Sequence, residues 1–167
     1  LVVSASDRVM SVAIADGDTQ VLSGTGVPGI LDGHPDTAQF DFPYGLGVDS
    51  TGNAFVACYN GEAVRKVLSS GYVSTIAGTT GANNTDNAIG VWAELEKPNG
   101  VAIDANDFIL VTEYTNSNLR RITQDGVVTT LATGLDGPFG IAVAPNGDMA
   151  LTSYLSHLVK LHPVAPL

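Results

Sequence analysis

The sequence of 167 residues contains a single cysteine, Cys58, so no disulfide can form within the chain. Cys58 follows the apolar residues 54–57, and this context predicts a buried, unreactive thiol. No group of cysteines and histidines has the spacing of a structural zinc site. These absences exclude a disulfide-stapled scaffold and a zinc-finger type of domain.

Basic residues are also scarce. Seven Lys and Arg residues stand against 17 Asp and Glu residues, which gives a formal net charge of -10. Binding to the phosphate backbone of nucleic acids needs a basic surface, so we expect no nucleic-acid partner. No apolar run reaches the roughly 18 residues of a membrane-spanning helix, so we expect no membrane partner.

The chain lacks any convincing helical periodicity and carries an internal repeat instead. Residues 42–49, 97–104 and 137–144 each contain Pro-x-Gly followed by an alternating apolar run. The prolines of the first two segments are 55 residues apart, and those of the last two are 40 residues apart. Self-similarity with this period is typical of repeat proteins.

Each repeat predicts four short β-strands. Its apolar runs are four to six residues long, rich in Val, Ile and Thr, and separated by Asp, Asn and Gly residues that favour turns. Tyr59, Tyr114 and Tyr154 follow the second run at matching positions, and we interpret them as structural residues between repeats. Four antiparallel strands per unit are the signature of a β-propeller blade. The predicted fold class is therefore all-β, with propeller blades of four antiparallel strands.

One propeller fragment accounts for residues 1–167. It consists of a partial blade at 1–24, blades at about 40–78 and 95–133, and a partial blade at about 136–162. The first unit lacks its first strand and the last lacks its fourth, which leaves about 14 strands in an incomplete ring. An open arc exposes the apolar faces of its end blades. We expect the chain to be part of a larger protein or to self-associate through these faces.

Two long linkers, 24–42 and 78–97, separate the units, whereas the third, 133–136, is minimal. Each long linker has an acidic middle and ends in an apolar residue, Phe40 or Leu95, which we expect to pack on the next blade. The basic residues of the third strands, Arg65 and Arg120 among them, are expected to pair with acids on neighbouring strands.

With these motifs, the chain resembles the NHL-repeat family of β-propellers over residues 1 to about 162. The repeated Pro-x-Gly phrase, the Asn-Leu-Arg-Arg-Ile third strand at 118–122 and the Val-x-Thr-Ile-Ala-Gly fourth strand at 73–78 carry the resemblance. The last unit departs from it, with Ala144 in place of the usual Asp. The resemblance implies a propeller that usually has six or more blades.

The first functional hypothesis is a non-catalytic interaction module, without a cofactor, that binds a protein or peptide partner. Loops on a rigid scaffold commonly carry recognition, and the two long linkers would form much of that surface. Their apolar residues Ile30, Leu31, Ile89 and Trp92 are candidate contacts. Trp92 is the strongest candidate for a binding hot spot, and packing against a neighbouring blade is an equally weighted interpretation.

The alternative hypothesis is a metal-dependent hydrolase or lyase of the gluconolactonase-like type. Asn99 occupies the middle position of Pro-x-Gly, where the other repeats have Tyr44 and Phe139. The resemblance to gluconolactonase-type propellers implies a divalent cation such as calcium at this Asn-Gly pair, with Asp104 and Glu113 as further oxygen ligands.

A structural interpretation of the same residues competes with the metal site. Asn99 would then be a polar residue at a channel mouth, and Asp104 would be a turn former. Glu113 would be a partly solvated acid paired with Arg120 or Arg121.

Overall fold

The computed structural model describes residues 2–78, 86, 90–154 and 158–161. These residues form four antiparallel sheets and one short 3₁₀ helix, η1 (Gly90–Trp92). This arrangement confirms the predicted all-β fold class. No helix in the described residues is long and apolar enough to cross a membrane.

The strands follow one another within each sheet in chain order. The first sheet contains β1 (Val2–Ala5), β2 (Arg8–Val12) and β3 (Thr19–Ser23). The second contains β4 (Pro43–Val48), β5 (Ala54–Cys58), β6 (Ala63–Val67) and β7 (Val73–Ala77). The third contains β8 (Pro98–Ile103), β9 (Ile109–Glu113), β10 (Asn118–Ile122) and β11 (Val128–Ala132). The last contains β12 (Pro138–Val143), β13 (Met149–Ser153) and β14 (Leu158–Leu161).

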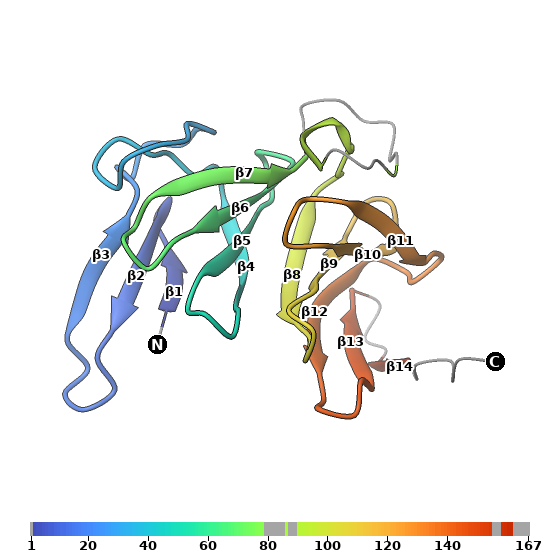
Figure 1. Ribbon diagram of the computed structural model, residues 1–167. Helices are drawn as coiled ribbons and strands as arrows, with labels where there is room; N and C mark the ends of the chain where they lie inside the picture. The colour runs from blue at the N-terminus through green and yellow to red at the C-terminus, as the bar shows by residue number, and fades with distance from the viewer. Residues whose placement is uncertain (1, 79–85, 87–89, 155–157, 162–167) are drawn as a thin grey trace.

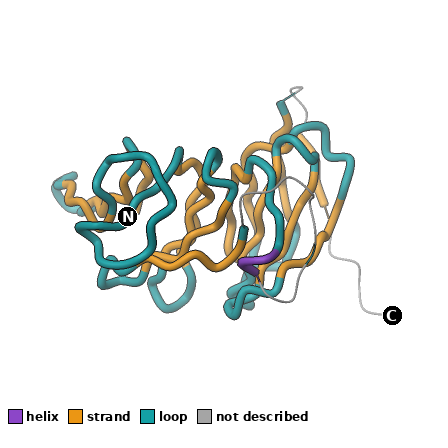
Figure 2. The backbone as a smooth tube through the Cα atoms, turned by 90° about the horizontal axis from the view of Figure 1, so that it is seen from above, coloured by secondary structure: helices purple, strands orange, loops and turns teal. Residues whose placement is uncertain are grey.

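The four sheets lie in a row, with the first and last sheets at opposite ends (Figures 1 and 2). The inner strand β8 lies beside both β4 and β12, the inner strands of the neighbouring sheets. Over the described residues the row does not close into a ring. The sheets therefore have the arrangement of consecutive propeller blades in an open arc.

The glycine of Pro-x-Gly lies where two inner strands approach each other most closely. A Cβ atom on Gly45 would lie 2.2 Å from the carbonyl oxygen of Asn99, and one on Gly100 would lie 2.3 Å from that of Phe139. No real side-chain carbon tolerates such a distance to backbone. The repeated glycine is therefore required by packing between blades, and not by a turn.

The apolar residues at the ends of the linkers are buried between blades, as expected. Phe40 is fully buried in a cluster between the first two sheets, and Leu95 lies in the cluster between the second and third. Leu135, three residues before Pro138, takes the matching place in the third cluster. Each linker thus contributes an apolar side chain to the core next to the blade that follows it.

Two buried arginines fix the long linkers to the outer strands. Arg65 donates to the Asp32 carboxylate at 2.6 Å, and Asp32 also accepts from the backbone N–H of Thr75 at 3.0 Å. The second long linker repeats this arrangement. Arg120 donates to the Asp86 carboxylate at 2.8 Å. The prediction that acids on neighbouring strands pair with these arginines was incomplete, because linker carboxylates provide a partner for both.

The hydrogen bonds to Asp86, the carboxylate of the second long linker, also affect its protonation. Burial acts to raise the pKa of Asp86, but hydrogen bonds from Thr130 and the charge of Arg120 outweigh it, so this pKa is lowered. Asp86 therefore remains ionised in the folded protein at neutral pH.

Candidate functional site at the proline end of the inner strands

The inner strands all begin at the same end of the sheets. Pro43 pairs with Cys58, Pro98 with Glu113 and Pro138 with Ser153, so the starts of β4, β8 and β12 lie beside the ends of β5, β9 and β13. We call this the proline end. Three of the predicted site residues can be placed relative to it: Asn99, Glu113 and Asp104.

A continuous cluster of aromatic side chains lies at the proline end. Its rings contact one another with centroids 5.1 to 6.4 Å apart. We call it the aromatic row, and its members are Phe42, Tyr44, Tyr59, Tyr114, Phe139 and Tyr154. Aromatic pairs of this geometry contribute about 0.5–1.5 kcal/mol each beyond their buried area.

Four members of the aromatic row are also well exposed. The exposed fraction is 48% for Phe42, 47% for Tyr44, 41% for Phe139 and 67% for Tyr154. Tyr59 and Tyr114 are half-buried, and burial, followed by the neighbouring Tyr114 and Tyr44 rings, raises the pKa of Tyr59. The interpretation of the three tyrosines as structural residues between repeats agrees with Tyr114, which contacts two rings of the next sheet, but it did not predict this exposed surface. Tyr44 and Phe139, the aromatic residues at the middle position of Pro-x-Gly, were the sequence feature that could have indicated an aromatic surface.

The segments around the aromatic row are acidic. Carboxylates lie in the turns after β1 and β5 and in the residues just before the inner strands, and none of them is fully buried: Asp7, Asp41, Glu62, Glu94, Glu96 and Asp136. Lys97 lies among them, with its ammonium group 5.3 Å from the centre of the Tyr59 ring and 3.7 Å from Glu62. The segments that flank the aromatic row therefore carry more acidic than basic residues.

Asn99 is enclosed at this end. Its exposed fraction is 4%, and the rings of Tyr44 and Phe139, from the inner strands on either side, have centroids 6.4 Å apart. The Asn99 Nδ2 atom is buried without a hydrogen-bond partner among the described residues. Asn99 is therefore a covered polar group, and the structural interpretation had placed a polar residue at a channel mouth here.

Glu113 lies fully buried next to the start of β8. It accepts hydrogen bonds from Arg120 Nη1 at 3.0 Å and from the backbone N–H of Glu96 at 2.7 Å. Burial raises the pKa of Glu113, although Arg120 and the N–H of Glu96 act against this shift. The predicted pairing with Arg120 is present, whereas the predicted partial solvation was wrong because the linker before β8 covers the carboxylate.

Asp104 lies in the turn between β8 and β9, at the end of the sheet opposite the proline end. Its carboxylate accepts from the backbone N–H groups of Asn106 at 2.8 Å and Phe108 at 2.9 Å, which is the role of a turn former. The length of β8, at about 3.3 Å per residue, places Asp104 about 16 Å from Asn99. The described residues contain no group of three or more His, Cys, Asp or Glu side chains that could hold a metal ion.

The predicted partner contacts lie outside the aromatic row. Trp92 is 65% exposed in η1, which lies beside the outer strand β7. Ile30 and Leu31 are 39% and 50% exposed, and a Cβ on Gly61 would lie 2.1 Å from Ile30 Cδ1. Ile89 lies outside the described residues. Trp92 is thus a solvent-facing residue, as a contact residue must be, but it is separate from the aromatic row.

Cys58 allows a direct test of burial at the proline end. Its thiol is free and fully buried, and burial raises its pKa to about 11. Because the thiolate is the reactive form, we expect no labelling by iodoacetamide at pH 8 in the native protein and complete labelling in urea. Mass spectrometry of the intact chain measures both. Labelling of the native protein at the rate seen in urea would contradict the buried position of β5.

No protein-family profile matches the sequence, and no curated protein matches it. Solved structures do. A streptogramin B lyase matches with a TM-score of 0.60 at 16% identity, over 96% of this chain and 49% of that one. A protein of unknown function from Bacteroides thetaiotaomicron matches with a TM-score of 0.74 at 16% identity, over 95% and 42%. A gluconolactonase from Xanthomonas campestris matches with a TM-score of 0.54 at 18% identity, over 68% and 35%.

The chain therefore spans half or less of the length of these structures. Identities of this size establish the fold and not the activity. The four-stranded antiparallel sheets, their order and these neighbours agree on one conclusion. The chain has the fold of the propeller-type proteins, as an arc of consecutive blades.

Proposed function

We propose that this chain belongs to an NHL-type propeller and acts as a non-catalytic module that binds a protein partner at the aromatic row. The observation that carries the proposal is the row itself. Rings from three consecutive sheets contact one another, and four of them are 41–67% exposed. Exposed aromatic side chains on a rigid scaffold are typical of binding hot spots.

The charge around the row indicates the chemistry of the partner. Six carboxylates lie in the segments that flank the rings, and the whole chain has a net charge of -10. Aromatic faces next to carboxylates favour guanidinium groups, which stack on rings and pair with carboxylates. We therefore propose an arginine-bearing peptide segment as the partner. Electrostatic attraction would accelerate its association at low salt.

A pair of probe peptides separates stacking from simple charge. We expect nonaarginine to bind more tightly than nonalysine in fluorescence anisotropy at 150 mM salt, because guanidinium stacks better on aromatic rings. The double variant Phe139→Ala/Tyr154→Ala should weaken nonaarginine binding about tenfold, since each exposed cation–π contact contributes about 0.5–1 kcal/mol. Both side chains are well exposed, so the fold should tolerate their removal.

Tyr72→Ala is the matched control. Tyr72 is 51% exposed in the turn between β6 and β7 and is not a member of the aromatic row. This variant should bind nonaarginine as the wild type does. Equal binding of the two peptides, or equal losses in the Tyr72 and row variants, would show that the row does not recognise arginine.

The second candidate function is the metal-dependent hydrolase or lyase. It is favoured by two enzyme neighbours, the streptogramin B lyase and the gluconolactonase. A cation there would have to draw on Asn99, which is 4% exposed, and on the fully buried Glu113.

A melting experiment tests this candidate. Calcium at 100 times its dissociation constant would stabilise the fold by about 2.7 kcal/mol, and Asn99→Ala should abolish the shift. An unchanged melting temperature in millimolar calcium would count against the enzyme function.

A further inference from the structure

The residue before each inner-strand proline has the same geometry in all three repeats. We call this place the pre-proline position, and it holds Phe42, Lys97 and Gly137. Their backbones are left-handed, with φ of 50°, 49° and 65°. The carbonyl oxygen of each accepts from the N–H of the tyrosine after the second strand of its own sheet, at 2.9, 3.2 and 2.9 Å. A side chain at this position therefore leaves the backbone in the same direction in each repeat.

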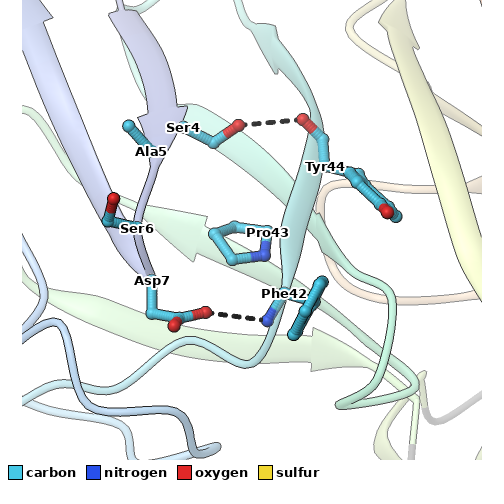
Figure 3. A pocket seen from close by; sticks show the side chains of 7 residues that line it. All are labelled: Ser4, Ala5, Ser6, Asp7, Phe42, Pro43 and Tyr44. Atoms are coloured by element: carbon cyan, nitrogen blue, oxygen red, sulfur yellow. Dashed lines mark hydrogen bonds between the residues drawn. The ribbon is translucent and has the colours of Figure 1, made fainter.

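The preceding sheet fixes the same position from the other side. Asp7, Glu62 and Ser117 lie directly before β2, β6 and β10, with φ of 56°, 51° and 55°. Asp7 accepts from the N–H of Phe42 at 3.0 Å (Figure 3), and Ser117 Oγ accepts from the N–H of Gly137 at 3.2 Å. The pre-proline position is thus held in the same relation to the sheet before it.

In the middle repeat, the side chain at the pre-proline position is a cation that lies over a tyrosine of the preceding sheet. Lys97 Nζ is 5.3 Å from the centre of the Tyr59 ring and 3.7 Å from the Glu62 carboxylate. A cation over an aromatic ring at this distance is a favourable contact. The fold therefore already binds one ammonium group at this place, and its own lysine supplies it.

The next repeat has the same place without a side chain to fill it. Gly137 is half-buried, and a Cβ there would lie 3.2 Å from Cε2 of Tyr114, the tyrosine equivalent to Tyr59. The rings of Phe139 and Tyr154 stand at 84° and 83° to the Tyr114 ring, with centroids 5.8 and 5.7 Å away. The residue that the repeat places beside Tyr114 belongs to this chain, and because it is glycine it brings no cation.

We propose that an arginine side chain of the partner binds over the Tyr114 ring, in the place that Lys97 fills over Tyr59. Guanidinium groups stack on aromatic rings, and the exposed Asp136, directly before Gly137, adds negative charge. This inference rests on the proposed function and adds where the cation binds. One subsite lies at Tyr114, and Lys97 keeps the equivalent subsite at Tyr59 closed.

Two substitutions with opposite expected effects test the subsite. Gly137→Lys should place an ammonium group over Tyr114 and weaken nonaarginine binding about fivefold in fluorescence anisotropy. Lys97→Gly should open the place over Tyr59 and strengthen binding about threefold. Lysine and phenylalanine hold the left-handed backbone at the pre-proline position of the other repeats, so the fold should accept lysine at 137. Lys97→Gly adds no atoms and needs no such space.

Two control variants separate the local cation from net charge. Ala144→Lys adds the same charge in the turn between β12 and β13, at the end of the sheet opposite the proline end. Lys66→Gly removes a lysine whose Nζ lies 5.3 Å from the centre of the Phe55 ring, outside the aromatic row. Both should leave nonaarginine binding unchanged. If each control changes binding as much as its counterpart at the pre-proline position does, the inference is overturned.

Fluorine NMR of the fluorotyrosine-labelled protein locates the bound cation. Nonaarginine should shift the Tyr114 resonance of the wild type, and after Lys97→Gly it should shift the Tyr59 resonance as well. Tyr114→Phe and Tyr59→Phe assign the two signals. A shift of Tyr59 in the wild type as large as that of Tyr114 would contradict the closing of this place by Lys97.

Failure of the subsite can be told apart from failure of the aromatic row. Weaker binding by Phe139→Ala/Tyr154→Ala, together with unchanged binding by Gly137→Lys, would overturn the subsite and leave the row as the binding surface. Absence of nonaarginine binding to the wild type would overturn both.

Discussion

Replacing Gly100 with alanine is expected to destabilise the fold by about 3 kcal/mol, at the upper end of the usual cost of overpacking. The added Cβ would lie 2.3 Å from the carbonyl oxygen of Phe139 and 3.2 Å from Gly140 Cα, so two inner strands must separate to accept it. Gly45→Ala should have a similar effect, because its Cβ would meet the backbone of residues 99–101. Urea denaturation measures both changes.

Gly140→Ala provides the matched control for these two variants. Gly140 occupies the same position in its repeat, yet the single neighbour that its Cβ would meet among the described residues is Thr152 Oγ1, at 3.1 Å. We expect it to cost less than about 1 kcal/mol, because surface substitutions that meet no backbone usually change stability by no more than about 0.5 kcal/mol. A cost equal to that of Gly100→Ala would show that the requirement for glycine comes from the strand itself and not from the contact between blades.

The second large effect is expected at Arg120. Arg120→Met should cost about 3–5 kcal/mol, because it leaves the fully buried Glu113 carboxylate without its cation. Arg65→Met should cost less, since its partner Asp32 is 49% exposed and can be hydrated, and Cys58 stands where Glu113 stands in the next repeat. Urea denaturation of both variants gives the comparison, and Glu113→Gln/Arg120→Met should recover part of the loss.

The pH dependence of stability gives this prediction a direction. Burial raises the folded-state pKa of Glu113 above its ordinary value of 4.5, so the folded protein holds this proton more tightly than the unfolded chain. Stability from this group is therefore greatest below pH 4.5 and falls as the pH rises through the folded-state pKa. Arg120→Met should enlarge this fall, and adding Glu113→Gln should abolish it. A pH-independent loss in Arg120→Met would contradict a buried, ionised Glu113.

Local sequence features predicted the elements of this fold because their causes are local. Alternating apolar residues, turn residues and the proline that starts each inner strand act within a few positions, so the sequence established the fold class and the strands. The turn role of Asp104 was predictable for the same reason, since its partners lie two and four residues away. Burial of Phe40 and Leu95 followed from their repeated spacing before proline.

The candidate sites depended on contacts between distant segments. Asp86 bonds Thr130 from 44 residues away, and Tyr44 meets Phe139 across the strand that carries Asn99. No local pattern encodes such distances, because they arise when blades stack. The sequence by itself thus determined the repeating strands and the glycine of each inner strand. Only the tertiary structure decided that Glu113 is buried, that Asn99 is covered, and that the aromatic rings form one exposed row, since burial is set by which blades become neighbours.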